Sequence, residues 1–222
     1  MNIVLPFLSV VLGAVLVFLG LTKSQKSWRL LLAFSGAFLL STAITSLLPE
    51  IFAHADTSIS YWILAGIVVQ VVLENISKGA EHGHIHIHKN ASLPWALFLG
   101  LSLHALIEGF PIHNHTKLLW AIVIHKLPIA MMLTAALWQT KTSMRLRLAL
   151  LLGFALMTPL GSYLNETAVF LKPYAVQITA LVAGVTLHIS TTILFESAEN
   201  HRFNRSKIIV ILVGLGLAAV LH

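Results

Sequence analysis

Apolar residues occupy eight long stretches of the sequence, and the segments between them hold most of its charge. The stretches lie near residues 2–22, 30–48, 59–77, 92–112, 116–138, 146–164, 174–195 and 207–222. Most have about the 20 residues that a helix needs to cross a bilayer. The pattern therefore predicts an all-α membrane protein with eight transmembrane helices, the last one short. Residues 1–22 lack the basic start and cleavage site of a signal peptide, so we interpret them as the first helix.

The composition supports this interpretation. Hydrophobic residues make up 57% of the 222 residues and charged residues only 10%, with a mean hydropathy of +0.88. A chain this apolar is typical of a membrane protein and not of a soluble domain. We expect one transmembrane domain over residues 1–222. The sequence has no cysteine, which excludes disulfides and thiolate ligands.

The basic residues are placed asymmetrically between the apolar stretches. A net charge of +6 would suggest nucleic acid as the partner of a soluble protein, but here eleven of the fourteen Lys and Arg residues lie in alternate loops. Only Lys117 and Lys172 lie in the other loops. Cytoplasmic loops carry such an excess of basic residues, so we expect both termini to lie outside. We expect a multi-pass protein of the cell membrane, which is the inner membrane in a Gram-negative cell. Its partner is then the lipid bilayer and not nucleic acid.

Four ionisable residues interrupt the fourth and fifth apolar stretches: His104, Glu108, His125 and Lys126. A charged side chain at the centre of a membrane helix costs roughly 2.5–3.5 kcal/mol on insertion scales, so such residues usually face the protein interior and have a function there. His104 and Glu108 are four residues apart and share one face of a helix. If the two helices are antiparallel, His104 and His125 lie about 12 and 13 Å from the same end, at one level.

Two imidazoles and one carboxylate are ligands that suit a borderline divalent metal ion such as zinc. Three protein ligands leave one position open for water or for exchange of the ion. A site that binds and releases metal in mid-membrane is what a transporter needs. We therefore predict His104, Glu108 and His125 as metal ligands, with Lys126 tuning the charge beside them.

A second histidine-rich feature follows the third stretch. Residues 78–91 form a predicted cytoplasmic loop in which His82, His84, His86 and His88 occupy every second position. Neutral imidazole is a common protein ligand for zinc, copper and nickel, so we predict that His84, His86 and His88 bind metal. A pH sensor is the alternative for this loop, and its internal position argues against an affinity tag.

Further polar residues lie towards the cytoplasmic ends of other predicted helices. We predict His188 as an exit-side metal ligand and Glu196 as a receiver of the ion at the inner mouth, with a buried, hydrogen-bonded role as the alternative for His188. We expect Gln70 and Glu74, near the inner end of the third helix, to be interfacial. Among the prolines, Pro49 is expected to end the second helix, with Glu50, and Pro128 to break the fifth.

Together these pieces resemble the ZIP (Zrt/Irt-like) family of divalent-metal transporters, in a short form typical of bacteria. The matching segments are residues 36–50, the histidine-rich loop, His104-Ala105-Leu106-Ile107-Glu108-Gly109, His125-Lys126-Leu127-Pro128, and the helix from Ala183 to Glu196. The resemblance implies a ZIP-like bundle of eight helices with both ends outside and a transport site between the fourth and fifth. It also implies metal movement into the cytoplasm, described for the family as one helix bundle sliding against the other.

Three positions depart from the fuller family pattern. Ala105 stands where many members have a polar residue, Ile129 where many have an acidic one, and Lys126 where a two-metal centre has another ligand. An ammonium group beside Glu108 can replace a second cation electrostatically, so we predict a site for one metal ion.

The sequence thus predicts transport of a divalent metal, zinc before iron or manganese, as substrate and without a cofactor. Three other interpretations remain open: an intramembrane zinc-dependent hydrolase in which Glu108 is the base, a non-transporting metal sensor, and a buried network of the four central residues. The sequence also leaves open whether two copies form a homodimer. We expect no enzymatic activity, because no His-Glu-x-x-His segment or additional acid is evident.

Overall fold

The computed structural model describes residues 4–20, 25–53, 57–77, 79, 95–196 and 205–221, and within these residues every regular element is helical. The helices are α1 (Val4–Phe18), α2 (Gln25–Thr42), α3 (Leu48–Ala53), α4 (Ile59–Ser77), α5 (Trp95–Gly109), α6 (Thr116–Trp138), α7 (Met144–Thr167), α8 (Ala175–Glu196) and α9 (Arg205–Val220). A π-helical segment, η1 (Ala43–Leu47), joins α2 to α3, and two short 3-10 segments, η3 (Phe110–Asn114) and η4 (Val169–Tyr174), follow α5 and α7. The predicted all-α bundle is confirmed.

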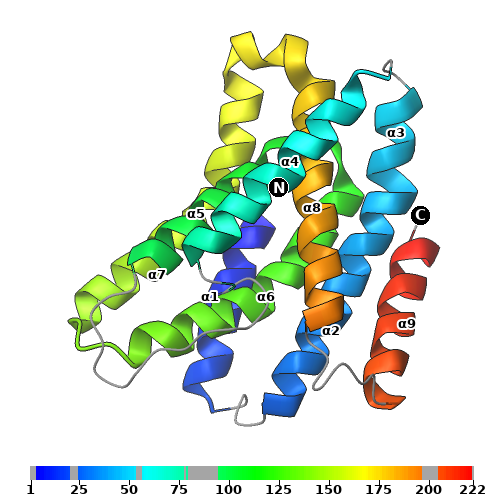
Figure 1. The fold of residues 1–222 in the computed structure, drawn as a ribbon. Helices are drawn as coiled ribbons and strands as arrows, with labels where there is room; N and C mark the ends of the chain where they lie inside the picture. The colour runs from blue at the N-terminus through cyan, green and yellow to red at the C-terminus, as the bar shows by residue number, and fades with distance from the viewer. Residues whose placement is uncertain are drawn as a thin grey trace.

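Successive helices of the bundle alternate in direction (Figure 1). The helices α1, α4, α6 and α8 run one way, while α2 with α3, α5, α7 and α9 run the other way. The start of α1 and the end of α9 therefore point to the same side. If the basic loops are cytoplasmic, as the charge pattern predicts, this side is the outer one.

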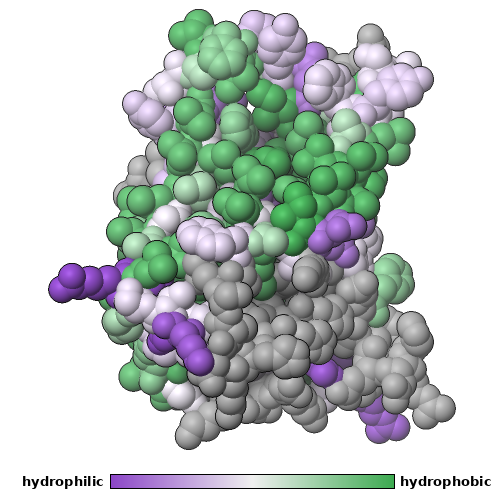
Figure 2. Space-filling model, turned by 60° about the vertical axis from the view of Figure 1, so that its left-hand side comes forward, coloured by the Kyte–Doolittle hydropathy of each residue, from purple (hydrophilic) through white to green (hydrophobic). Residues whose placement is uncertain are grey.

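Six of the helical segments are long and apolar enough to cross a membrane: residues 27–53, 59–77, 95–113, 116–138, 144–167 and 169–195. The helix α1 is apolar but shorter. Large apolar side chains such as Leu64, Val68 and Leu152 are exposed on the outside of the bundle, and Figure 2 shows a broad field of such side chains on one face. A surface of apolar side chains is expected for helices in contact with lipid, so the chain is a multi-pass membrane protein.

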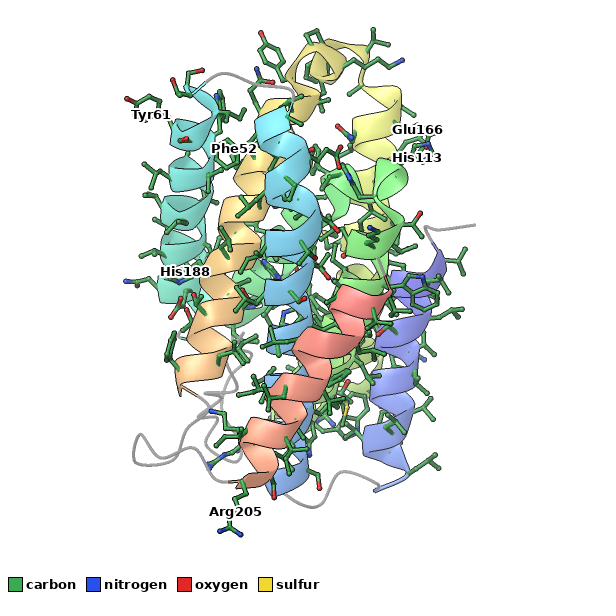
Figure 3. All side chains as sticks on the ribbon, turned by 90° about the vertical axis from the view of Figure 1, so that its right-hand side faces the viewer. Phe52, Tyr61, His113, Glu166, His188 and Arg205 are labelled. Atoms are coloured by element: carbon green, nitrogen blue, oxygen red, sulfur yellow. The ribbon has the colours of Figure 1, made fainter. Side chains whose placement is uncertain are left out.

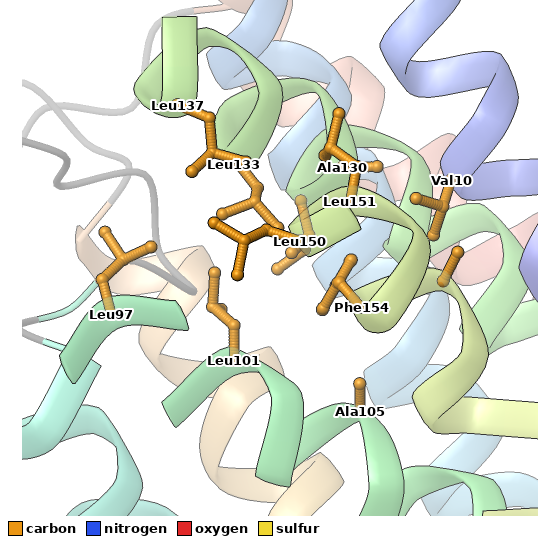
Figure 4. Close-up of a cluster of buried hydrophobic side chains, with 12 residues drawn as sticks. Val10, Leu97, Leu101, Ala105, Ala130, Leu133, Leu137, Leu150, Leu151 and Phe154 are labelled. Carbon is orange, nitrogen blue, oxygen red and sulfur yellow. The ribbon is translucent and has the colours of Figure 1, made fainter. Parts of the chain in front are cut away.

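The helices form two groups. In the first, α1 packs on α6 and α5 packs on α7, and their shared core includes Val10, Leu101, Leu133 and Phe154 (Figure 4). In the second group, α4 packs on α8, and α2 packs on α9 and α8. The groups meet chiefly where α2 contacts α6 and where α4 contacts α5.

Glycines allow the closest helix crossings within these groups. A Cβ atom added to Gly66 on α4 would lie 1.9 Å from the carbonyl oxygen of Leu181 on α8, and one added to Gly184 would lie 2.0 Å from that of Ile63. Gly109 on α5 and Gly161 on α7 form a similar crossing. Small residues are enriched at membrane helix interfaces because they let the backbones approach closely.

Two details of the helices differ from the sequence-based expectation. The second helix does not end at Pro49 and Glu50 but continues through η1 to Ala53, because the wider π turn can be inserted without ending the helix. The helix α6 continues through Pro128 from Thr116 to Trp138. A membrane helix tolerates a proline where neighbouring groups satisfy the freed backbone.

Candidate metal centre

The four central ionisable residues come from two consecutive helices, two from the last turns of α5 and two from the middle of α6. His104 and Glu108 lie on α5, His125 and Lys126 lie on α6, and their exposed fractions are only 2–5%. Burial of all four among apolar helices means that their charges must be balanced within the protein.

The Glu108 carboxylate is the hub of this cluster. Its Oε1 atom accepts hydrogen bonds from the Lys126 ammonium group and, at 3.1 Å, from the Thr158 hydroxyl on α7. Its Oε2 atom lies 3.1 Å from Nε2 of His104. The ring of Phe154 lies below Lys126, with its centroid 5.1 Å from Nζ. The helix α5 thus places Glu108 between a fixed cation on one side and an imidazole on the other.

The two central histidines lie side by side, as the spacing predicted. Their ring centroids are 6.3 Å apart and the rings are nearly perpendicular. Nδ1 of His125 lies 3.4 Å from the hydroxyl of Ser35 on α2. Ser35 belongs to the second group of helices, through α2, and His125 belongs to the first group, through α6. The cluster therefore lies where the two groups meet.

These side chains are close to a metal-binding arrangement, although they do not form one as they stand. Among the described residues, no three His, Asp or Glu side chains converge tightly enough to hold one metal ion. A tetrahedral zinc ion bound to two imidazoles places the ring centroids about 5 Å apart, so the rings would have to approach by about 1 Å. Nδ1 of His104 is buried without a hydrogen-bond partner in the described part of the chain. The ligand set therefore stays a prediction.

The predicted exit-side histidine has a partner that the sequence did not indicate. Nε2 of His188 on α8 lies 2.6 Å from Oε2 of Glu74 on α4. The expectation that Gln70 and Glu74 are interfacial is wrong for Gln70, which is fully buried. The helices α4 and α8 cross closely at their glycines, which brings these polar residues inside.

Other predicted residues lie outside what the structure describes. His84, His86 and His88 are outside the described residues, with the whole histidine-rich loop except Gly79. Glu196 is the last residue of α8, but its side chain is not described. Their assignment as metal ligands stays a prediction.

Two residues of the central cluster were missed by sequence reasoning. Thr158 was not predicted as part of the site, although a hydroxyl in an apolar helix signals a buried hydrogen bond. Ser35 gave no signal, because no spacing rule connects a serine on α2 with a histidine on α6. Both are fully buried.

The fold and the cluster define a multi-pass helical membrane protein with a charged, histidine-containing centre between two groups of helices. The family model of the ZIP zinc transporter matches residues 74–222, and the chain belongs to this family. It is 26% identical over 162 residues to the zinc transporter ZIP1 of Danio rerio, a match that covers 67% of this chain and 54% of the relative. The chain thus spans about half the length of the curated relative.

Proposed function

We propose that this protein moves a divalent metal ion, zinc in the first place, across the membrane into the cytoplasm. The observation that carries the proposal is the cluster of His104, Glu108 and His125, which are buried at one level on two adjacent helices. Family membership supports metal transport, and the name of the Danio rerio relative supports zinc. Iron and manganese are the competing substrates.

In this proposal the ion binds to the two imidazoles and to Oε2 of Glu108. The 3.1 Å contact between His104 and Glu108 opens as the metal enters, because the imidazole nitrogen and the carboxylate oxygen turn towards the ion. Imidazole must be neutral to bind metal, so affinity falls when the histidines are protonated. Uptake that is unchanged at a strongly acidic pH would contradict this ligand set.

Lys126 has a separate role beside the ion. Its ammonium group holds Oε1 of Glu108, which leaves one carboxylate oxygen for metal and supplies the positive charge of a second cation. We therefore expect one metal ion at the centre. Metal titration that reveals two coupled central sites, present also in Lys126→Met, would contradict this role.

The direct test is uptake of radioactive zinc into proteoliposomes of defined orientation. The wild type is compared with His104→Ala and Glu108→Ala, with Fe²⁺ and Mn²⁺ as competitors. We expect saturable uptake in the wild type and none in either variant, and the competition ranks the metals. Equal uptake in the wild type and both variants would contradict the central site.

Two outcomes would favour the other interpretations. Tight zinc binding that depends on His104 without any uptake would favour a metal sensor. Turnover of a peptide or lipid by the purified protein would favour a hydrolase. In the transporter that we propose, the loop histidines His84, His86 and His88 receive or sense the ion on the cytoplasmic side, after it has passed His188 and Glu196.

A further inference from the structure

A polar cluster between α4 and α8 is separate from the central residues. His188 and Glu74 are in contact at 2.6 Å, and each side chain is about one-fifth exposed, 21% and 23%. Figure 3 shows His188 beside α4, well below His113 and Glu166, which lie near the opposite end of the bundle. Both side chains are thus partly exposed, although apolar helices surround them.

Gln70 adds a second observation. It precedes Glu74 by four residues and so lies on the same face of α4. Its side chain is 0% exposed, and neither its amide nitrogen nor its amide oxygen has a hydrogen-bond partner among the described residues. A buried, unpartnered amide is costly in a membrane protein, where no bulk water compensates for the lost hydrogen bonds. Its amide oxygen is therefore available to bind a further ligand.

The pair lies inward of the central cluster. A Cβ atom on Gly100 of α5 would lie 2.9 Å from the Cβ of Ser77 and 3.2 Å from the carbonyl oxygen of Leu73. Gly100 is therefore level with the segment of α4 that holds Glu74. Because Gly100 is one helical turn nearer to the start of α5 than His104, Glu74 lies about 6 Å inward of His104.

A structural clamp between α4 and α8 does not account for these residues. The glycine crossings at Gly66 and Gly184 already hold the two helices at the closest distance that their backbones allow. A clamp would also leave the amide group of Gln70 without a role. The three side chains together offer one nitrogen and two oxygen donors from two helices that run in the same direction.

We propose that Glu74, His188 and Gln70 form a second binding site for a divalent metal ion, inward of the central site and between α4 and α8. The site binds metal whether or not the central residues do, and it rests on the proposed function only for its place on the transport path. A zinc ion would separate the His188 nitrogen from the Glu74 oxygen to about 3.3 Å, because tetrahedral ligands at about 2.0–2.1 Å are that far apart. From there Thr192 and Glu196, four and eight residues after His188, lead to the end of α8.

The experiment measures Zn²⁺ bound per chain to the purified full-length protein, and the absorption spectrum of bound Co²⁺. All variants carry His82, His84, His86 and His88 replaced by serine, so that the loop does not contribute. The test variant is Glu74→Gln with His188→Gln. The matched control is His113→Gln with Glu166→Gln, which removes another His–Glu contact, at 3.8 Å and half-exposed at the outer surface. Glu108→Gln removes the central site separately.

We expect the test variant to lose one bound Zn²⁺ and the Co²⁺ spectrum to lose the corresponding component, while the outer control keeps both. The swapped variant Glu74→His with His188→Glu keeps the same donors and should restore binding. Unchanged binding in the test variant would overturn the proposal, as would loss of metal that the swap does not restore. If the central site does not bind metal but the second site does, Glu108→Gln binds as much Zn²⁺ per chain as the parent protein, and the test variant binds less.

Discussion

Thr158 is the residue through which α7 positions the carboxylate of Glu108. Its hydroxyl lies 3.1 Å from Oε1 of Glu108 and 2.8 Å from the carbonyl oxygen of Ala105. Hydrogen bonds to charged groups contribute about 1.5–3 kcal/mol. We expect Thr158→Val, which keeps the shape but not the hydroxyl, to weaken central zinc affinity by about tenfold. Titration calorimetry checks this, and Thr158→Ser should restore the affinity. Equal affinity in all three proteins would show that Thr158 does not position Glu108.

Lys126 neutralises a carboxylate that is only 4% exposed. Removal of one partner from a buried ion pair costs about 3–5 kcal/mol, because it leaves an uncompensated charge. We therefore expect Lys126→Gln to unfold at a lower temperature than the wild type without metal and to regain stability in zinc, which then supplies the missing charge. Thermal unfolding in detergent, with and without Zn²⁺, tests this. A variant as stable as the wild type without metal would contradict it.

At the scale of helices, the glycine crossings decide which helices can pack together. We expect Gly66→Ala to destabilise the protein by about 1–3 kcal/mol, because the new methyl group meets the backbone oxygen of Leu181 and must push α8 away. Gly216→Ala is the control, since no atom of a neighbouring helix lies within 4 Å of the added carbon. Alanine favours a helix over glycine, so this control should keep or slightly raise stability. Thermal unfolding that ranks Gly216→Ala below Gly66→Ala would contradict the packing.

The sequence predicted where the helices lie better than it predicted where they end or break. Each predicted apolar stretch overlaps a helix of the described residues, because a helix satisfies its own backbone hydrogen bonds in an apolar environment, whereas most of α3 lies beyond the predicted end of the second stretch. The helix end expected at Pro49 and the helix break expected at Pro128 do not occur. Packing of η1 against the core through Ala43 and Leu47, and of α6 against α1, outweighs the preference of proline for a break.

For the whole molecule, sidedness follows from the basic loops and is testable because the sequence has no cysteine. We expect Lys172→Cys, in η4 at the predicted outer end, to react with a membrane-impermeant maleimide in intact cells. Lys141→Cys, in the connection between α6 and α7, should react only after the cells are opened. The reverse labelling would invert the topology and with it the direction of transport.

The sequence by itself determined the helical class, the approximate positions of the helices, and that His104, Glu108, His125 and Lys126 lie inside two of them. These features depend on local composition and on the cost of burying charge, which are visible along one chain. The ZIP family resemblance, which rests on these residues together with residues 36–50, the histidine-rich loop and the segment from Ala183 to Glu196, is confirmed.

Only the tertiary structure decided which residues complete each polar cluster. Thr158 and Ser35 come to the centre from α7 and α2, and Glu74 meets His188 across the α4–α8 crossing. Such contacts depend on how two helices are rotated and how closely they approach. That geometry is set by glycine crossings and by side-chain packing between segments far apart in the sequence, which no spacing within one helix encodes.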